Sequence, residues 1–257
     1  MAEGHGSRAA AFTTARVPLE TRLRRAAVRS VLQVTPAYRR IEFAGADLAG
    51  FDSPGADDHL RLFFPPSGQP LPALTGEGVP SGLESREYTP VSWDGVQTLV
   101  IDFVLHGDGL GGRWAETAVP GDQVYVGGPR RSLVFDGRPE WWLLIGDLTS
   151  LPAIRRLAAQ VPSGVPVDVI LACENTADEQ EVTSTGDLTV TWVHPGSGSD
   201  DSVTPLLDAL REVPARPGDG FAFVAAEQGI VAPARALLAE RGVDLERSVV
   251  KGYWKRS

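Results

Sequence analysis

The chain has 257 residues, 42% of them hydrophobic, and a formal net charge of -9 at pH 7. This length can bury a substantial core and fits one large domain or two smaller ones. The acidic balance gives no general attraction for nucleic acid or for an anionic membrane surface, so we expect neither as a partner. The sequence contains neither a signal-peptide pattern nor a run long and apolar enough to span a bilayer, which favours a cytoplasmic protein.

The cysteine and histidine content argues against a metal site. The single cysteine, Cys173, lies in the apolar run VDVILAC and is expected to be buried. One cysteine allows neither an intramolecular disulfide nor a cysteine metal cluster. The four histidines are far apart in the sequence and show no ligand spacing, so we expect no bound metal. The acidic pair Asp57 and Asp58 precedes a strand-like run and is interpreted as a solvated loop.

The first half of the chain is predicted to form an antiparallel β-barrel. Residues 1–21 show no clear periodicity and are expected to form a flexible arm. Short β-rich runs bounded by Pro, Gly or Asp follow: AVRSVLQVT, RRIEFAG, HLRLFFP, QTLVIDFVL and QVYVGG. Several short strands with little helical pattern between them predict a small barrel over residues 22–137.

The second half alternates between strand and helix patterns. Buried-strand runs such as WWLLIGD, VPVDVILAC and FAFVAAE are separated by segments with apolar residues at helical spacing. This order predicts an α/β domain over residues 138–257, with a mostly parallel sheet covered by helices on both faces. A ligand is then expected beyond the carboxyl ends of the strands, near residues 146–151 and 225–229.

A glycine-rich turn follows the strand predicted over residues 99–105. Gly109, Gly111 and Gly112 lie in this turn, which leads into RWAE, a plausible short helix. Such a turn can offer backbone N–H groups to an anion. The alternative for the same glycines is a flexible surface turn.

Several motifs occur in a fixed order along the chain: REYT, FVLHGDG, PGD, GGPRRS, WWLLIGDLTSLPAI, FAFVAAE and KGYWKR. Together they resemble the siderophore-interacting protein family, flavin-dependent ferric-siderophore reductases distantly related to ferredoxin reductases. The resemblance covers nearly the whole chain. It implies that FAD lies between the barrel and the α/β domain, that NAD(P)H or a ferredoxin reduces it, and that a ferric siderophore is the acceptor.

The resemblance also assigns roles to individual residues. In the family's Arg-x-Tyr-Thr-x-Arg segment, an arginine faces phosphate, the tyrosine packs on the isoalloxazine and the threonine bonds its polar edge. A glycine turn that begins with His-Gly cradles the pyrophosphate. The matching cofactor-binding residues in this chain are Arg86, Tyr88, Thr89, His106, Gly107 and Gly109.

The chain departs from the family pattern at three places. Val91 stands where the segment ends in arginine, and Leu110, Gly111 and Gly112 replace the Pro-Ala-Ser portion of the turn. In the second domain, Gly-Asp-Glu-Thr has become Gly-Asp-Leu-Thr, with Leu148 in place of the acidic residue. The three changes at cofactor and acceptor positions suggest that binding of flavin or reductant has been relaxed or lost.

Two functions therefore remain open, and a binding protein without turnover is a third. The principal hypothesis is a cofactor-independent, non-redox cyclase that holds a large, mostly apolar polyketide-like substrate in the former flavin cleft and promotes a [4+2] cycloaddition. The alternative is the inherited FAD-dependent reductase using NAD(P)H or ferredoxin. Substrate identity and oligomeric state are left open. The catalytic residues expected for the cyclase are Arg86, Thr89 and His106. Its substrate would contact Tyr88, Val91, Trp114, Leu148, Lys251, Tyr253 and Trp254.

Overall fold

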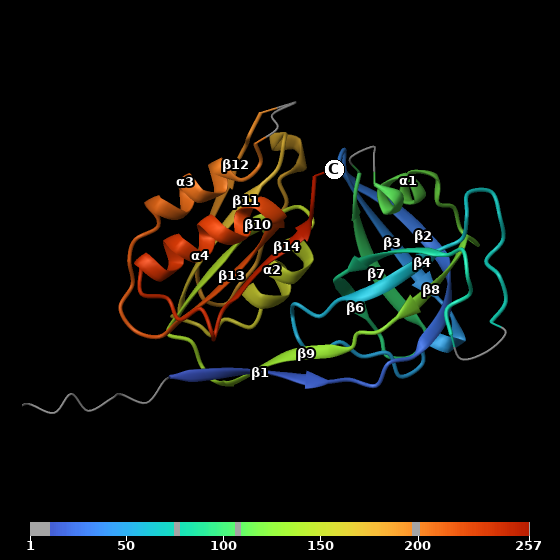
Figure 1. The fold of residues 1–257 in the computed structure, drawn as a ribbon, viewed down its shortest axis with the longest axis horizontal. Coiled ribbons are helices and arrows are strands. Elements are labelled where there is room, and N and C mark those ends of the chain that lie inside the picture. The colour runs from blue at the N-terminus through green and yellow to red at the C-terminus, as the bar shows by residue number, and fades with distance from the viewer. Residues whose placement is uncertain (1–10, 75–77, 106–108, 197–200, 257) are drawn as a thin grey trace, which may run out of the picture.

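The computed structural model describes residues 11–74, 78–105, 109–196 and 201–256. They form a curled antiparallel sheet followed by a parallel sheet with helices on both faces, and the two halves lie side by side (Figure 1). This arrangement confirms the predicted fold class, a β-barrel followed by an α/β unit. The predicted domain boundaries at residues 21/22 and 137/138 stay predictions.

The first half is a seven-stranded sheet in the order β5-β4-β8-β2-β3-β7-β6. Burial alternates along its strands, as in β4, where Leu60, Leu62 and Phe64 are buried and the residues between them are less so. A strand with one face on a core requires this period of two. The elements are β2 (Leu23–Thr35), β3 (Tyr38–Ala44), the 3-10 turn η1 (Ala46–Leu48), β4 (Leu60–Phe64), β5 (Glu84–Tyr88), β6 (Pro90–Trp93), β7 (Thr98–Val104), α1 (Leu110–Thr117) and β8 (Gln123–Gly127).

The sheet is curled because its two edge strands are neighbours in the sequence. β5 and β6 stand at opposite ends of the strand order, yet only Thr89 separates Tyr88 from Pro90. Two residues of chain span about 7 Å at most, so the two edges must approach each other at this point. Thr89 is therefore the crossing between the edges, and we call the segment 88–90 the edge crossing.

A two-stranded ribbon runs beneath both halves. Strand β1 (Phe12–Pro18) pairs antiparallel with β9 (Arg131–Gly137), the segment that leads from the barrel to the parallel sheet (Figure 1). The expectation of a flexible arm is therefore wrong for residues 12–18. Their order comes from this ladder and from Phe12, which packs against Phe135 and Phe221. Residues 1–10 lie outside the described residues.

The second half is a five-stranded parallel sheet in the order β12-β11-β10-β13-β14. The chain moves outward from β10 through β11 to β12, then returns to the other side of β10, so the strand order reverses between β10 and β13. The strands are β10 (Trp141–Asp147), β11 (Pro166–Ala172), β12 (Asp187–Val193), β13 (Gly220–Glu227) and β14 (Val249–Trp254). The helices are α2 (Leu151–Ala158), α3 (Thr204–Glu212) and α4 (Val231–Glu240), with 3-10 turns η2 (Thr176–Asp178) and η3 (Gln228–Ile230).

The helices cover both faces of the parallel sheet, as predicted. Helix α2 packs on one face, and α3 and α4 pack on the other. The core beneath α2 also includes Tyr38 from the barrel, Phe12 from the ribbon and Ala56 from the loop before β4. This core cluster therefore extends across the boundary between the two halves, while the barrel has a second cluster of its own.

Among the described residues, no helix combines the length and apolarity that a membrane crossing requires. In the same ranges, His, Cys, Asp and Glu side chains form no group of three placed to hold a metal ion. Cys173 is buried, 5% exposed, as its apolar run predicts.

Candidate functional site

Thr89 lies at the centre of the candidate site because it occupies the crossing between the two sheet edges. Its side chain is buried, and its hydroxyl oxygen has no hydrogen-bond partner among the described residues. A buried hydroxyl without a partner costs free energy, so such groups often bond a ligand or a water molecule. Thr89 was predicted to contact cofactor or substrate, and its role stays a prediction.

Tyr88 turns its ring into the barrel. The ring centroid lies 4.6 Å from that of Phe103, and Phe64 meets it edge-on. Burial raises the pKa of the phenol above its ordinary value. The hydroxyl lies against helix α1 at Gly111, where a Cβ atom would overlap the hydroxyl oxygen. Glycine at position 111 therefore makes room for Tyr88.

Trp114 belongs to the barrel core. Its ring stacks on Phe43 at a centroid distance of 6.1 Å and an interplanar angle of 15°, and it also contacts Phe64 and Phe103. Trp114 is half-buried, and its predicted contact with a substrate stays a prediction. Helix α1 directs an apolar side to the barrel, and Trp114 lies on that side.

Arg86 is exposed on the edge strand β5. In the antiparallel register Arg86 faces Leu62 and Tyr88 faces Leu60, so both lie on the sheet face that carries the core. The Arg86 guanidinium donates to the backbone oxygen of Ser85 over 2.8 Å and is otherwise open to solvent, which leaves its charge available to an anion.

The predicted glycine turn is described only in part. His106 and Gly107 lie outside the described residues. Gly109 precedes the first residue of α1, and no side chain caps the helix there. The first N–H groups of an α-helix lack internal partners, so this end can face an anion.

Lys251 is held by a buried carboxylate. Asp57 is fully buried, and its carboxylate lies 3.2 Å from the Lys251 ammonium and 3.1 Å from the Arg16 guanidinium. Burial pushes the pKa of Asp57 upward, but the charges of Lys251 and Arg16 together outweigh it and leave the pKa below its ordinary value. The interpretation of Asp57 as part of a solvated loop is wrong, because its partners come from distant segments.

Tyr253 connects Lys251 with the edge crossing. The Lys251 ammonium lies 5.0 Å from the centre of the Tyr253 ring. Burial raises the pKa of the Tyr253 phenol, and the nearby Thr89 hydroxyl offsets part of this effect. Neither hydroxyl has a hydrogen bond of regular geometry within the described residues. Thr89, Lys251 and Tyr253, which sequence reasoning named separately, therefore lie together.

Trp254 and Leu148 lie at the carboxyl end of β10. The Trp254 indole donates to the Asp147 carboxylate over 2.7 Å. Burial raises the pKa of Asp147, although hydrogen bonds from Thr149 and Trp254 counteract the shift. Leu148 is 7% exposed and packs in the shared core, so its side chain offers little surface to a substrate.

Arg156 on helix α2 is a residue that sequence reasoning missed. Its guanidinium reaches the barrel and donates to the carbonyl of Pro90 over 3.4 Å, beside the half-buried Val91. It appeared in the sequence as an ordinary polar residue of an amphipathic helix. The helical pattern gives its spacing along α2, but no local pattern shows what lies across from it.

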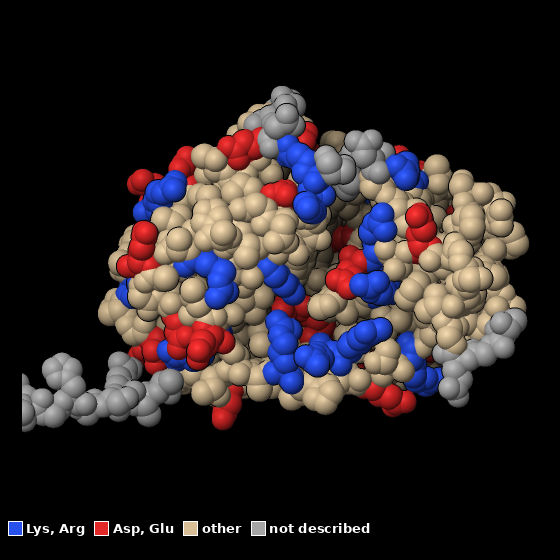
Figure 2. Space-filling view, in the orientation of Figure 1, with Lys and Arg blue, Asp and Glu red and all other residues tan. Residues whose placement is uncertain are grey.

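The molecular surface is hollowed between the two halves. Figure 2 shows Lys and Arg side chains gathered around this hollow, with acidic side chains inside it. A separate pocket of about 250 Å³ lies near the carboxyl end of β13. Its lining residues are Asp201, Ser202, Val203, Glu227 and Arg256. Ligands of open parallel sheets bind at this end of the strands.

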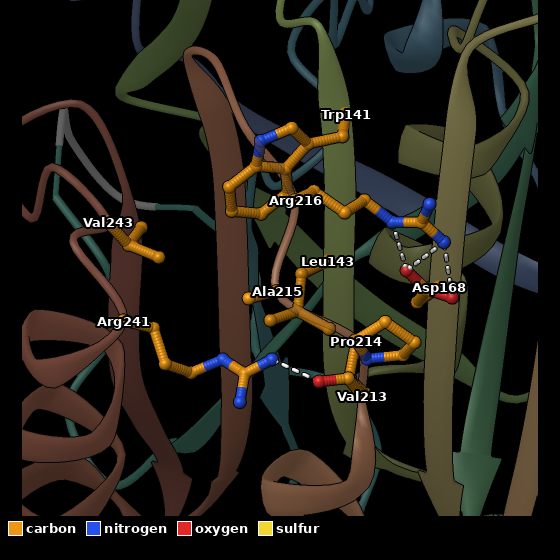
Figure 3. A pocket seen from close by; sticks show the side chains of 9 residues that line it. All are labelled: Trp141, Leu143, Asp168, Val213, Pro214, Ala215, Arg216, Arg241 and Val243. Carbon is orange, nitrogen blue, oxygen red and sulfur yellow. Dashed lines mark hydrogen bonds and ion pairs between the residues drawn. The ribbon is translucent and has the colours of Figure 1, made fainter.

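A small cavity at the opposite end of the parallel sheet is closed by its own side chains. It measures about 20 Å³, enough for about one water molecule. Figure 3 shows the Arg216 guanidinium paired with Asp168 and the Arg241 guanidinium turned to the carbonyl of Val213. Its charged groups are thus already engaged, and the cavity is too small for a cofactor.

Comparisons with known proteins agree with this architecture. Residues 27–133 match the family model described as siderophore-interacting FAD-binding domain, and residues 139–257 match that of siderophore-interacting protein. The chain is 29% identical to an NADPH-dependent ferric-chelate reductase of Escherichia coli, over 93% of this chain and 95% of the relative. It is 27% identical to the ferric vibriobactin reductase ViuB of Vibrio cholerae, over 84% and 83% of the two chains.

A solved structure shows the same overall arrangement. The siderophore utilization protein from T. fusca superposes with a TM-score of 0.86 at 32% identity, covering 95% of this chain and 97% of that one. The fold and the matched segments define a two-part protein with a flavin-binding-like barrel and a nucleotide-binding-like α/β half. The chain belongs to the siderophore-interacting protein family, as its motifs predicted.

The named relatives bear on the two hypotheses unequally. The two relatives described above are named as a ferric-chelate reductase and a ferric vibriobactin reductase, which favours the reductase alternative. The expected cyclase, its polyketide-like substrate and its independence of a cofactor receive no support from these comparisons.

Proposed function

We propose that this protein is an FAD-dependent ferric-chelate reductase that uses NAD(P)H as its reductant. The observation that carries the proposal is the buried hydroxyl of Thr89, which has no partner among the described residues at the crossing between the sheet edges. The match of residues 27–133 to a siderophore-interacting FAD-binding domain supports it. The identity with a ferric-chelate reductase over almost the full chain supports the choice of reaction.

The residues at the edge crossing fit a flavin nucleotide. The Thr89 hydroxyl can donate to a polar atom of the ring system, and the exposed guanidinium of Arg86 can pair with a phosphate. The uncapped N-terminus of α1 at Gly109 offers further N–H groups to an anion. When bound, FAD would supply the electron transfer that amino-acid side chains cannot perform.

The protein's own contribution is binding and orientation. Arg86 and the end of α1 would hold the phosphates, while Thr89 would fix the ring edge by one hydrogen bond. Tyr88, packed on Phe103, forms a rigid wall at the same crossing. The basic rim of the hollow would attract an anionic ferric chelate. The iron is the substrate here, so the reaction requires no resident metal.

The visible absorption spectrum of the purified protein tests the proposal. After incubation with FAD and removal of free FAD by gel filtration, we expect the protein to retain flavin absorption. Adding NADPH in the absence of oxygen should bleach that absorption. We also expect reduction of a ferric chelate, followed with a ferrous-specific dye. A protein that ignores FAD under these conditions would contradict the reductase and return attention to a non-redox use of the cleft.

A further inference from the structure

Arg156 reaches from one half of the molecule into the other. It lies in the last turn of α2, the helix that follows the carboxyl end of β10. Its guanidinium donates to the hydroxyl of Ser53 over 3.2 Å and also contacts the Ser53 backbone oxygen. It donates to the carbonyl of Pro90 over 3.4 Å. One side chain of the α/β half thus contacts two separate segments of the barrel half.

The guanidinium also packs against an aromatic ring. Its central carbon lies 4.9 Å from the centroid of Trp93, three residues beyond Pro90 on strand β6. The planar fork of arginine can stack on a ring and donate several hydrogen bonds at once, whereas the ammonium of lysine cannot. These contacts therefore depend on the shape of arginine as well as on its charge.

Within the described residues, the hydrogen bonds of Arg156 go to uncharged groups. The nearest carboxylate in its network is that of Asp58, which accepts from the Ser53 hydroxyl over 3.2 Å. Desolvation lowers the pKa of Arg156, and the charges of Asp58, Asp57 and Asp52 partly offset this effect. Arg156 therefore brings a positive charge to the edge crossing, with the carboxylates of Asp58, Asp57 and Asp52 in its surroundings.

Strand pairing restrains the two ends of the edge crossing, where Tyr88 faces Leu60 and Pro90 faces Ile101. Thr89 belongs to neither edge strand, and the β6–β7 ladder is irregular between Pro90 and Ser92. Proline has no backbone N–H, so Pro90 can join a hydrogen bond only through its carbonyl. The contact from Arg156 to that carbonyl therefore fixes the position next to Thr89 from outside the barrel.

We propose that Arg156 is the positioning residue that fixes the edge crossing for FAD binding. This inference rests on the proposed function, because it concerns the same flavin site. Arg156 holds Pro90 and Trp93 against α2, and thereby fixes Thr89 and Tyr88 in the geometry that binds the flavin. It also adds a positive charge next to Val91, through its contact with the Pro90 carbonyl.

Affinity for FAD, measured by quenching of flavin fluorescence, tests this role without relying on turnover. We expect Arg156→Met and Arg156→Lys each to weaken FAD binding about tenfold, because both lose the fork that contacts Ser53 and Pro90. The matched control is Arg155→Met. Arg155 is the neighbouring half-buried arginine of α2, but it donates to the backbone oxygen of Glu181 instead.

A spectroscopic readout separates positioning from general stability. At saturating FAD, we expect the position and fine structure of the flavin band to change in Arg156→Lys and to stay as in the wild type in Arg155→Met. Thermal unfolding without FAD measures how much stability Arg156→Lys and Arg155→Met each lose relative to the wild type. If Arg156→Met does not fold, Trp93→Leu removes the stacking partner, and we expect it to weaken FAD binding severalfold.

The outcomes distinguish this inference from the proposed function. A wild-type protein that binds no FAD would contradict both. Wild-type FAD binding together with unchanged affinity and spectrum in Arg156→Lys would overturn the positioning role and leave the reductase proposal intact. An equal loss of affinity in Arg155→Met would also overturn it, because the effect would then belong to α2 in general.

Discussion

The indole of Trp254 donates a hydrogen bond to the carboxylate of Asp147 across 2.7 Å, which joins the last strand to the carboxyl end of the central strand β10. The bond restrains β14 at the edge of the hollow between the halves. It also stabilises the ionised form of a carboxyl group whose pKa is raised by burial. The contribution of this bond to stability should therefore depend on pH.

Replacing Trp254 with phenylalanine removes this donor. We expect a loss of about 1–2 kcal/mol in the free energy of unfolding near pH 8. The folded-state pKa of Asp147 is raised, so protonation favours the folded state as the pH falls. The cost of Trp254→Phe should then shrink at pH 5, because a protonated carboxyl group depends less on the donor. Urea denaturation at both pH values measures the difference. In an Asp147→Asn background the pH dependence of the cost should disappear.

Replacing Lys251 with methionine leaves the buried carboxylate of Asp57 with Arg16 as its remaining ion-pair partner. We expect a loss of about 3 kcal/mol in the free energy of unfolding at pH 7, since removing one partner of a buried pair is strongly destabilising. The double variant Asp57→Asn/Lys251→Met should recover part of the loss. Chemical denaturation of the single and double variants gives the coupling energy. A coupling close to zero would show that the pair does not hold the halves together.

The ion pairs of Asp57 with Lys251 and Arg16 should make the stability of the folded protein sensitive to acid. The pKa of Asp57 is lowered in the folded state, so its ion pairs contribute stability above the unfolded pKa. That stability is lost as the pH falls through the lower folded value. We expect the melting temperature of the wild type to fall more steeply below pH 4 than that of Asp57→Asn. If the melting temperatures of the wild type and of Asp57→Asn fall equally steeply with pH, Asp57 does not make this contribution.

Gly111 and Tyr88 should be energetically coupled. A Cβ at position 111 would overlap the Tyr88 hydroxyl, so Gly111→Ala should displace the ring and cost about 1–3 kcal/mol. In a Tyr88→Phe background the hydroxyl is absent, and alanine favours helix by about 1 kcal/mol over glycine. A Cβ at position 111 would still lie 3.0 Å from the ring carbon Cζ, so we expect the cost of Gly111→Ala to be smaller in the Tyr88→Phe background than in the wild type. Denaturation of the four proteins in this double-mutant cycle provides the measurement.

Thr89→Val separates binding from stability. Valine has nearly the same shape as threonine but lacks the buried hydroxyl that has no partner among the described residues. We expect the free energy of unfolding without ligand to rise by about 1 kcal/mol, because burying an unpaired polar group is unfavourable. FAD affinity should fall at the same time. A gain in stability with unchanged FAD affinity would mean that the hydroxyl does not face the flavin.

Much of the fold follows from local sequence patterns. Alternating burial in runs such as HLRLFFP gives half-buried strands, and the apolar runs WWLLIGD and FAFVAAE give the strands of a parallel sheet. The order of motifs was sufficient to identify the family. These features depend on neighbouring residues, so the sequence carries them directly.

The site was only partly predictable, because its contacts join segments that are distant in the chain. Asp57 looks solvated beside Asp58, yet Arg16 and Lys251 bury it from two other strands. Arg156 follows the polar spacing of its helix, and its partners Ser53 and Pro90 cannot be read from that spacing. Trp114 packs half-buried against the barrel core, and its ring partner Phe43 comes from a distant strand that no local pattern indicates.

The pairing of β1 with β9 has a consequence for how the chain reaches its fold. Phe12 leaves the ribosome early, yet its partner in the ladder is Gly137. β1 cannot pair with β9 until the whole barrel has been synthesised, so the N-terminal strand joins its ladder late in translation. Until β9 has been synthesised, β1 has no partner and presents an unpaired edge on which another nascent chain could form a strand. Removing residues 12–18 would instead leave β9 without its partner in the finished protein, and intermolecular association is the expected result.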